Sequence, residues 1–273
     1  MTRPTLRLLP ALFVLAFAGA GCDINVGDNG FSMDFAAGKA QDEWSRTYTV
    51  AAAGRLEIVN VNGAITATPA DGGQVEVRAE RIVKASSDEA ASQALKEIEL
   101  AETVSADRVR IETRAPKGRR INHQVRYFVK VPKGLAVTFE NTNGAVRLEN
   151  LEGQIVASTV NGGVRGSGLK GPVRASTTNG GVDIAMAAVT GEVQLETTNG
   201  GIRLELPRDA KATLDASCTN GGISVAESGW ASMEETERSR RRFRGTLNGG
   251  GPRISAETTN GGIRIRAAGS ETS

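Results

Sequence analysis

The stretch ASTTNGGVDI, residues 175–184, decides the fold, because close copies of it recur along the chain. The other copies are ASTVNGGVRG, LETTNGGIRL, ASCTNGGISV and AETTNGGIRI. Aligned with two more divergent copies, they give the equivalent positions Asn62, Asn143, Asn161, Asn179, Asn199, Asn220 and Asn260. From Asn143 onward the steps are 18, 18, 20, 21 and 40 residues. A constant period of this size is typical of stacked repeats, in which each unit buries its apolar face only against its neighbours.

Apolar and polar residues alternate on both sides of each asparagine. The position six residues before the asparagine is always apolar: Leu56, Val137, Ile155, Val173, Val193, Leu214 and Ile254. Apolar residues return three residues after the asparagine, and in most copies again five residues after it. A period of two is that of a β-strand, so these positions share one face. Each unit is therefore predicted to be a strand, a corner at Asn-Gly, a second strand and a second corner.

Two all-β folds satisfy this pattern. An antiparallel β-meander is the alternative, because Asn-Gly between alternating runs is a strong hairpin signal. In a parallel β-solenoid, equivalent strands stack about 4.8 Å apart, so equivalent residues lie above one another. Stacked amides can then form hydrogen bonds along the pile, which explains why the asparagine is retained in every copy. We therefore predict an all-β, parallel β-solenoid over residues 136–268, with a period of about 18–21 residues.

The N-terminus predicts export and attachment to a membrane. Two arginines precede the run LLPALFVLAFAGAG, which ends at Cys22. The run is shorter than the roughly 20 apolar residues that span a bilayer, so residues 1–21 are predicted to be a signal peptide. It resembles a bacterial lipoprotein signal, which implies that Cys22 is acylated, although Gly19 stands where such signals prefer leucine. Ordinary secretion and an uncleaved anchor are the alternatives.

The remaining residues divide into three parts. Residues 22–45 lack a sustained period and are predicted to be a lipidated N-terminus and flexible tether. Residues 46–135 alternate as strands, interrupted by a helix near 87–100. Within the solenoid, the 40-residue step contains a charged insert near 229–245, predicted to be a short strand or helix leaving the stack.

The insert is the candidate binding site. It concentrates one charge in five arginines: Arg238, Arg240, Arg241, Arg242 and Arg244. One interpretation is a solvated excursion, in which Glu234, Glu235 and Glu237 offset part of this charge. The other is a contact with lipid headgroups or acidic envelope polymers, because basic residues are attracted to anionic surfaces.

The runs VPKG, NTNGAVRLENLEG, TTNGGV and GTLNGGGP, together with the helix between early strands, resemble a bacterial β-strand-repeat domain family of unknown function. Its members are often labelled as adhesins. The resemblance covers roughly residues 46–268. It implies a β-solenoid in the cell envelope and no established activity.

The residues that most catalytic sites need are scarce. The chain has one histidine, His123, in an alternating strand, so neither a serine triad nor a histidine metal site is expected. If Cys22 takes lipid, Cys218 has no partner for a disulfide or a metal and is predicted to be a small core residue. Outward acids are interleaved with outward arginines, which is typical of a soluble sheet. We therefore predict no catalytic residues, no metal and no cofactor.

The sequence thus predicts a non-enzymatic cell-envelope lipoprotein that acts as a structural, adhesion or interaction module. It would be lipid-anchored to a bacterial membrane, either periplasmic or surface-exposed. Its expected partners are the membrane, through Cys22, and an envelope protein, polysaccharide or anionic lipid. The net charge of +2 gives no reason to expect a nucleic acid. A polysaccharide-active β-solenoid enzyme and an accessory or sensor subunit of an envelope system are the alternatives.

Overall fold

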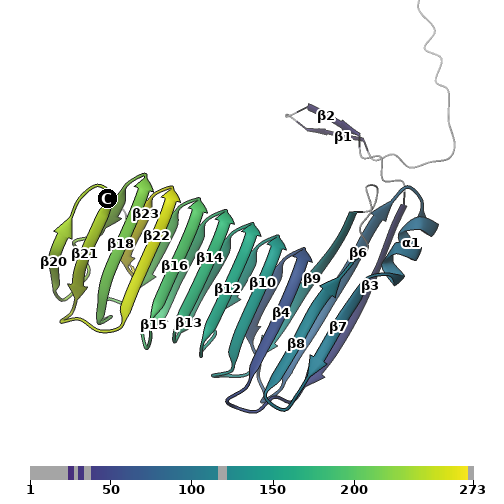
Figure 1. Ribbon diagram of the computed structural model, residues 1–273, viewed down its shortest axis with the longest axis horizontal. Helices are drawn as coiled ribbons and strands as arrows, with labels where there is room; N and C mark the ends of the chain where they lie inside the picture. Colours follow the sequence, from purple (N-terminus) through teal and green to yellow (C-terminus); the bar gives the residue numbers. More distant parts are fainter. Residues whose placement is uncertain (1–23, 28–29, 34–37, 116–121, 270–273) are drawn as a thin grey trace, which may run out of the picture.

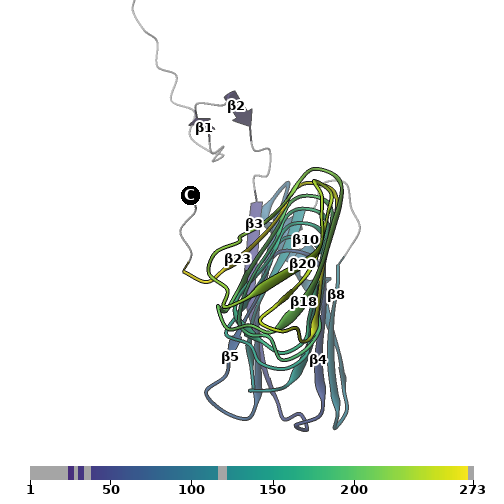
Figure 2. The same cartoon turned by 90° about the vertical axis from the view of Figure 1, so that its left-hand side faces the viewer.

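The computed structural model describes residues 24–27, 30–33, 38–115 and 122–269 of the chain. Within these ranges, nearly all strands belong to two sheets that face each other and run side by side along one elongated stack (Figure 1). Seen from the end of the stack, successive coils superpose as one flattened outline (Figure 2). The fold is therefore a two-sheet solenoid.

The first sheet has eleven strands among the described residues. In spatial order they are β20 (Met233–Arg238), β21 (Arg242–Leu247), β18 (Ala212–Asn220), β22 (Arg253–Asn260), β16 (Val193–Asn199), β14 (Val173–Asn179), β12 (Ile155–Asn161), β10 (Ala136–Asn143), β4 (Arg55–Asn62), β8 (Arg108–Arg114) and β7 (Glu99–Val104). We call it the eleven-stranded sheet.

The second sheet has ten strands among the described residues. In spatial order they are β19 (Ile223–Val225), β23 (Ile263–Ala267), β17 (Ile202–Leu206), β15 (Val182–Ala188), β13 (Val164–Lys170), β11 (Val146–Glu149), β5 (Ile65–Pro69), β9 (Asn122–Val131), β6 (Val75–Ala85) and β3 (Gly38–Tyr48). We call it the ten-stranded sheet.

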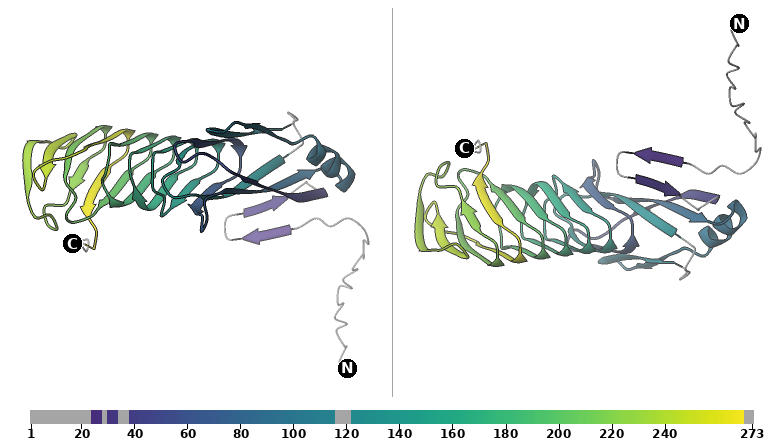
Figure 3. Two further views of the ribbon diagram at one scale, coloured as in Figure 1. Left: turned by 90° about the horizontal axis from the view of Figure 1, so that it is seen from below. Right: turned by 90° about the horizontal axis from the view of Figure 1, so that it is seen from above.

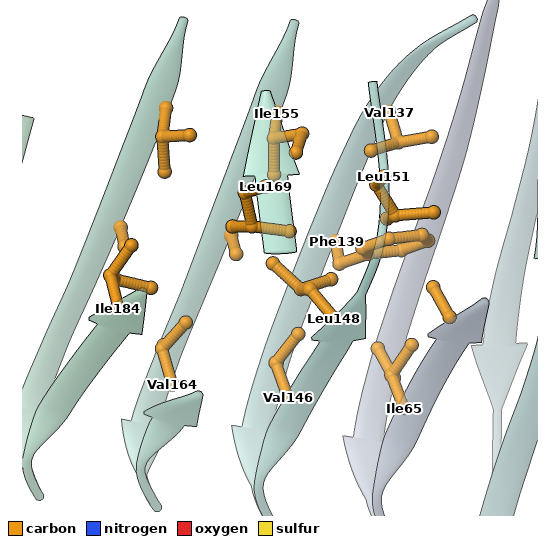
Figure 4. Close-up of a cluster of buried hydrophobic side chains, with 14 of the residues drawn as sticks. Ile65, Val137, Phe139, Val146, Leu148, Leu151, Ile155, Val164, Leu169 and Ile184 are labelled. Atoms are coloured by element: carbon orange, nitrogen blue, oxygen red, sulfur yellow. The ribbon is translucent and has the colours of Figure 1, made fainter. Parts of the chain in front are cut away.

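The repeats stack in parallel and in the predicted register. Val137 pairs with Ile155, Ile155 with Val173, and Val173 with Val193. The antiparallel meander is therefore wrong for the repeats; antiparallel pairs join strands only near the two ends of the described stack and in the hairpin β1–β2. The aligned aliphatic side chains fill the space between the sheets (Figure 4), and Ile155 is 1% exposed.

Polar columns run beside this core. Each corner asparagine except Asn62 donates a hydrogen bond from its side-chain amide to the side-chain oxygen of the asparagine on the adjacent strand nearer the N-terminal end of the stack, over 2.7–2.9 Å. Two residues earlier, buried threonine hydroxyls donate to a glycine carbonyl of the neighbouring coil, as Thr177 does to Gly162 over 2.8 Å. The predicted amide ladder is confirmed, and it satisfies polar groups that the corners would otherwise leave unpaired.

The spatial order of the last coils differs from the chain order. Strand β22 lies between β16 and β18, and β23 lies between β17 and β19. The side chain of Asn248, before β22, donates to the carbonyl oxygens of Arg208 and Ala210, over 3.0 and 2.9 Å. Arg208 in turn donates to the carbonyl of Ala268, over 3.1 Å. These hydrogen bonds join the connection before β18 to the chain just before β22 and just after β23. They thereby hold the coil formed by β22 and β23 between its two neighbours.

Three predicted features before the repeats need correction. Residues 38–45 are not tether, because β3 pairs along its whole length with β6. Residues 24–27 and 30–33 form the hairpin β1 (Ile24–Gly27) and β2 (Gly30–Met33), paired with each other. The helix α1 (Asp88–Lys96) is shorter than predicted. Ser87 caps it as expected, but the chain re-enters a strand at Glu99. The signal peptide and Cys22 lie outside the described residues.

Candidate functional site

The charged insert forms the hairpin β20–β21 at the end of the stack remote from α1 (Figure 1, Figure 3). Strand β21 pairs antiparallel with β18 and so extends the eleven-stranded sheet. The prediction that the insert leaves the stack is therefore wrong. Strand β18 would otherwise present an open edge of unpaired backbone groups, which the hairpin covers.

Three of the five predicted arginines are neutralised by carboxylates. Arg238 forms an ion pair with Glu235, and its guanidinium lies 5.3 Å from the centre of the Phe243 ring. The bond to Arg238 holds the pKa of the Glu235 carboxyl below its ordinary value. Arg242 and Arg244 both contact Asp215 and Glu237, with nitrogen–oxygen distances of 3.5–3.8 Å: Arg242–Asp215, Arg242–Glu237, Arg244–Asp215 and Arg244–Glu237. This part of the insert matches the mixed-charge interpretation.

The other two arginines lie in the turn between β20 and β21. Arg240 and Arg241 are exposed, and within the described residues neither side chain has an ion pair or hydrogen bond. Their carbonyl oxygens accept hydrogen bonds from the backbone amides of Ile223 and Cys218, over 3.1 and 2.9 Å. The turn therefore lies against the last corner of the stack, and its two uncompensated guanidinium groups mark the end of the solenoid.

A second basic feature is not among the predicted site residues, because the alternation of outward arginines and acids along the sequence indicates a balanced surface. Arg147, Arg165, Arg203 and Arg264 share one column on the outer face of the ten-stranded sheet, with Asp183 between them. The signal is present in the sequence, because each residue stands four positions after a corner asparagine. These positions are neighbours in space only because the strands that carry them stack in parallel and in register.

The other singled-out residues have structural roles. Cys218 is buried as predicted, and it is a free thiol within the described part of the chain. His123 lies at one end of the amide ladder, where its Nε2 is 3.2 Å from the amide nitrogen of Asn62. Among the described residues there is no group of three histidine, cysteine or acidic side chains that could hold a metal ion. No described helix has the length and apolar character needed to cross a bilayer.

These features define a parallel β-solenoid capped by a charged hairpin. Residues 51–266 match the family Toastrack DUF4097, and the chain belongs to this family of domains of unknown function. The family resemblance seen in the sequence is thereby confirmed. No curated protein matches the chain.

Solved structures with low similarity include three bacterial proteins. A candidate cell adhesion protein from Clostridium sporogenes is 12% identical over 84% of this chain and 100% of its own, with a TM-score of 0.47. A candidate adhesin from Bacteroides fragilis is 10% identical over 83% and 97%, with a TM-score of 0.37. A candidate lipid-binding protein from Parabacteroides distasonis is 7% identical over 83% and 97%, with a TM-score of 0.27. At these TM-scores they support no argument about function.

Proposed function

We propose that this protein is a non-enzymatic lipoprotein of a bacterial cell envelope, acting as an adhesion, structural or interaction module. The observation that carries the proposal is the order of strands along the stack. The described body begins with β3 at one end, and the basic turn between β20 and β21 lies at the other. A membrane attachment at the N-terminus would therefore leave the basic turn at the free end.

The dimensions support this arrangement. Eleven strands spaced about 4.8 Å apart give a stack of about 48 Å between β7 and β20. The sixteen residue steps from Cys22 to Gly38 span at most about 55 Å when fully extended, and less when the hairpin β1–β2 is formed. Arg240 and Arg241 can thus contact a partner well away from the bilayer in which Cys22 would be anchored.

The partner at the free end is proposed to be anionic. Arg240 and Arg241 lack carboxylate partners among the described residues, whereas the other arginines of the hairpin have them. A basic residue near an anionic surface contributes about 1 kcal/mol, so two give a weak, salt-sensitive contact. A weak contact of this kind suits a module present in many copies on a surface, because many such contacts can act together.

The anchor is tested by replacing Cys22. In the bacterium, the Cys22→Ala chain should fail to incorporate radiolabelled palmitate and should leave the membrane fraction. Label entering this variant at the parental level would refute lipid attachment at Cys22.

The basic turn is tested with the chain from Asp23 onward, which retains the whole described body and its core. At low salt it should co-sediment with anionic phospholipid vesicles, and Arg240→Ser/Arg241→Ser should abolish this binding without lowering the melting temperature. The control Lys96→Ser/Arg174→Ser removes the same charge from exposed residues elsewhere and should bind normally. Absence of parental binding at low salt would refute an anionic contact at this turn.

A further inference from the structure

The arginine column, defined as Arg147, Arg165, Asp183, Arg203 and Arg264, runs along the outer face of the ten-stranded sheet. Its members are direct neighbours on adjacent strands, in this order, and all are exposed. Equivalent residues of adjacent strands are about 4.8 Å apart. Two of its four neighbouring pairs, Arg147 with Arg165 and Arg203 with Arg264, place like charges side by side, and these pairs repel each other.

The column is poorly neutralised by the protein itself. Asp183 lies 3.9 Å from Arg203, and the two side chains are 52% and 72% exposed. For the other three arginines, no ion pair or hydrogen bond is found within the described residues. Two positions further along the same strands, by contrast, Arg266 donates to Glu205 over 2.8 Å. The sheet therefore has a neutralised pair of side chains directly beside a column that is left largely charged.

A glycine floor lies beside the column. The position two residues before the column residue is glycine in four coils, Gly163, Gly181, Gly201 and Gly262, and Gly222 continues this row in the adjacent coil. These glycines and the column residues Arg165, Asp183, Arg203 and Arg264 line a groove of about 530 Å³. Because the glycines carry no side chains, the guanidinium groups stand above an open strip of backbone.

The backbone does not demand glycine on this floor. Ala64 and Ala145 occupy the same position in two earlier coils. A Cβ on Gly163, Gly181, Gly201 or Gly262 would lie 3.1–3.3 Å from a backbone oxygen of the neighbouring coil, a tight contact that a shift of a few tenths of an ångström would relieve. A Cβ on the preceding Gly180 would lie 2.0 Å from the oxygen of Gly162, so that first glycine is required for stacking. The second glycine keeps the groove open instead.

We infer that this groove binds a linear acidic polysaccharide, laid along the stack with its carboxylates on the arginine column. Guanidinium groups pair with carboxylates through two parallel hydrogen bonds, which gives both strength and orientation. The column positions repeat about every 4.8 Å, close to the length of one sugar unit, so successive units lie over successive column residues, four of which are arginines. The inference adds the ligand class to the proposed envelope function and uses residues separate from the basic turn.

The groove fits other polyanions less well. Single-stranded nucleic acids are held by stacking of their bases on aromatic side chains. None of the described residues that line the groove is aromatic. A flat lipid surface would contact a broad patch, whereas these arginines follow one line with a glycine floor beside it. An extended chain of acidic sugars matches both the linear arrangement of the arginines and the open row of glycines beside it.

Asp183 provides a gain-of-binding test. It is the one acid in the column, and its carboxylate faces the position where the polymer's carboxylates would lie. Asp183→Asn removes this repulsion and releases Arg203 from its ion pair. A variant that only damaged the fold would not bind more tightly.

The experiment is calorimetric titration of the chain from Asp23 with oligogalacturonates of increasing length, and with their methyl-esterified, uncharged forms. Arg165→Ser/Arg264→Ser should weaken binding at least about tenfold, the loss expected for charged hydrogen bonds. Asp183→Asn should tighten it, and the control Lys96→Ser/Arg174→Ser should not change it. Affinity should rise with length until the oligomer spans the column.

Three results would overturn the inference: no binding of the parent at low salt, equal binding of the esterified oligomers, or an unchanged affinity of Arg165→Ser/Arg264→Ser. The same variants are also tested on the anionic vesicles. Loss of vesicle binding in Arg165→Ser/Arg264→Ser would assign the column to lipid instead. Failure here leaves the results for Cys22, Arg240 and Arg241 as a separate test of the proposed function.

Discussion

At the scale of single residues, the amide ladder has a direction. Each amide nitrogen donates toward the N-terminal end of the stack, so Asn143 donates to Asn62 over 2.7 Å. The oxygen of Asn62 is thereby used, and its nitrogen is the group that faces Nε2 of His123. Nε2 must therefore accept, which requires a neutral imidazole with its proton on Nδ1. The one histidine of the chain terminates the ladder.

This geometry predicts a pH dependence of stability. Burial lowers the pKa of His123 below its ordinary value of about 6.5, because the imidazolium is disfavoured inside the protein. The unfolded chain therefore binds a proton at higher pH than the folded one. The free energy of unfolding should be fully retained above about pH 6.5 and should fall as pH decreases through the window below it. Urea titrations at several pH values measure this slope.

The matched variant is His123→Gln, whose side-chain oxygen can accept from Asn62 but does not titrate. Because the chain has one histidine, the slope between about pH 5 and 6.5 should flatten in this variant. Identical slopes for the two proteins would show that His123 does not contribute.

At the scale of the strand, the register divides residues into those that hold the fold and those that only face solvent. Ile184 and Leu195 are both 0% exposed, on strands of opposite sheets. Arg174 lies on β14 at an outward position, exposed and without a described partner. One-residue steps along a strand thus separate core from surface, since exposed Arg174 stands between buried Val173 and Ala175.

Truncation of the buried side chains should therefore be costly. Ile184→Ala or Leu195→Ala should lower the free energy of unfolding by about 2–5 kcal/mol, from lost burial and the cavity left behind. Arg174→Ala should change it by less than about 0.5 kcal/mol. Denaturant titration of the three variants decides the matter, and similar effects at inward and outward sites would contradict the register.

At the scale of the whole molecule, the last coil is inserted between two earlier ones. Glu196 of β16 and Glu257 of β22 are direct neighbours, and Glu257 is also the neighbour of Ser217 on β18. Glu196 and Ser217 are then two strand spacings apart, about 9.6 Å. A stack in chain order would exchange these relations and make Glu196 and Ser217 neighbours.

Engineered disulfides distinguish the two orders, because cysteines bridge only when their Cα atoms lie within about 7 Å. In the chain from Asp23 with Cys218→Thr, the pair Glu196→Cys/Glu257→Cys should oxidise to a disulfide. The pair Glu196→Cys/Ser217→Cys should remain reduced. Thiol titration and mass spectrometry read out both variants, and the reverse pattern would establish the stack in chain order.

The sequence by itself determined the structure of the repeating solenoid unit. Its columns fixed the strands, the parallel register and the burial of Ile184 and Leu195, because in a stacked repeat every contact is between equivalent positions. It also predicted the amide ladder. Residues 38–45 were misjudged, because strand β3 is charged and pairs with a segment that lies outside the repeats.

Only the tertiary structure decided the order of the last coils and the make-up of the basic surfaces. Leu214 and Val193 both pair with Ile254 in the same register, so the repeat pattern is satisfied by either order of stacking. The choice depends on contacts of the connections, those of Asn248 and Arg208, which have no periodicity. The arginine column likewise becomes visible only once residues 18 to 61 positions apart are neighbours in space.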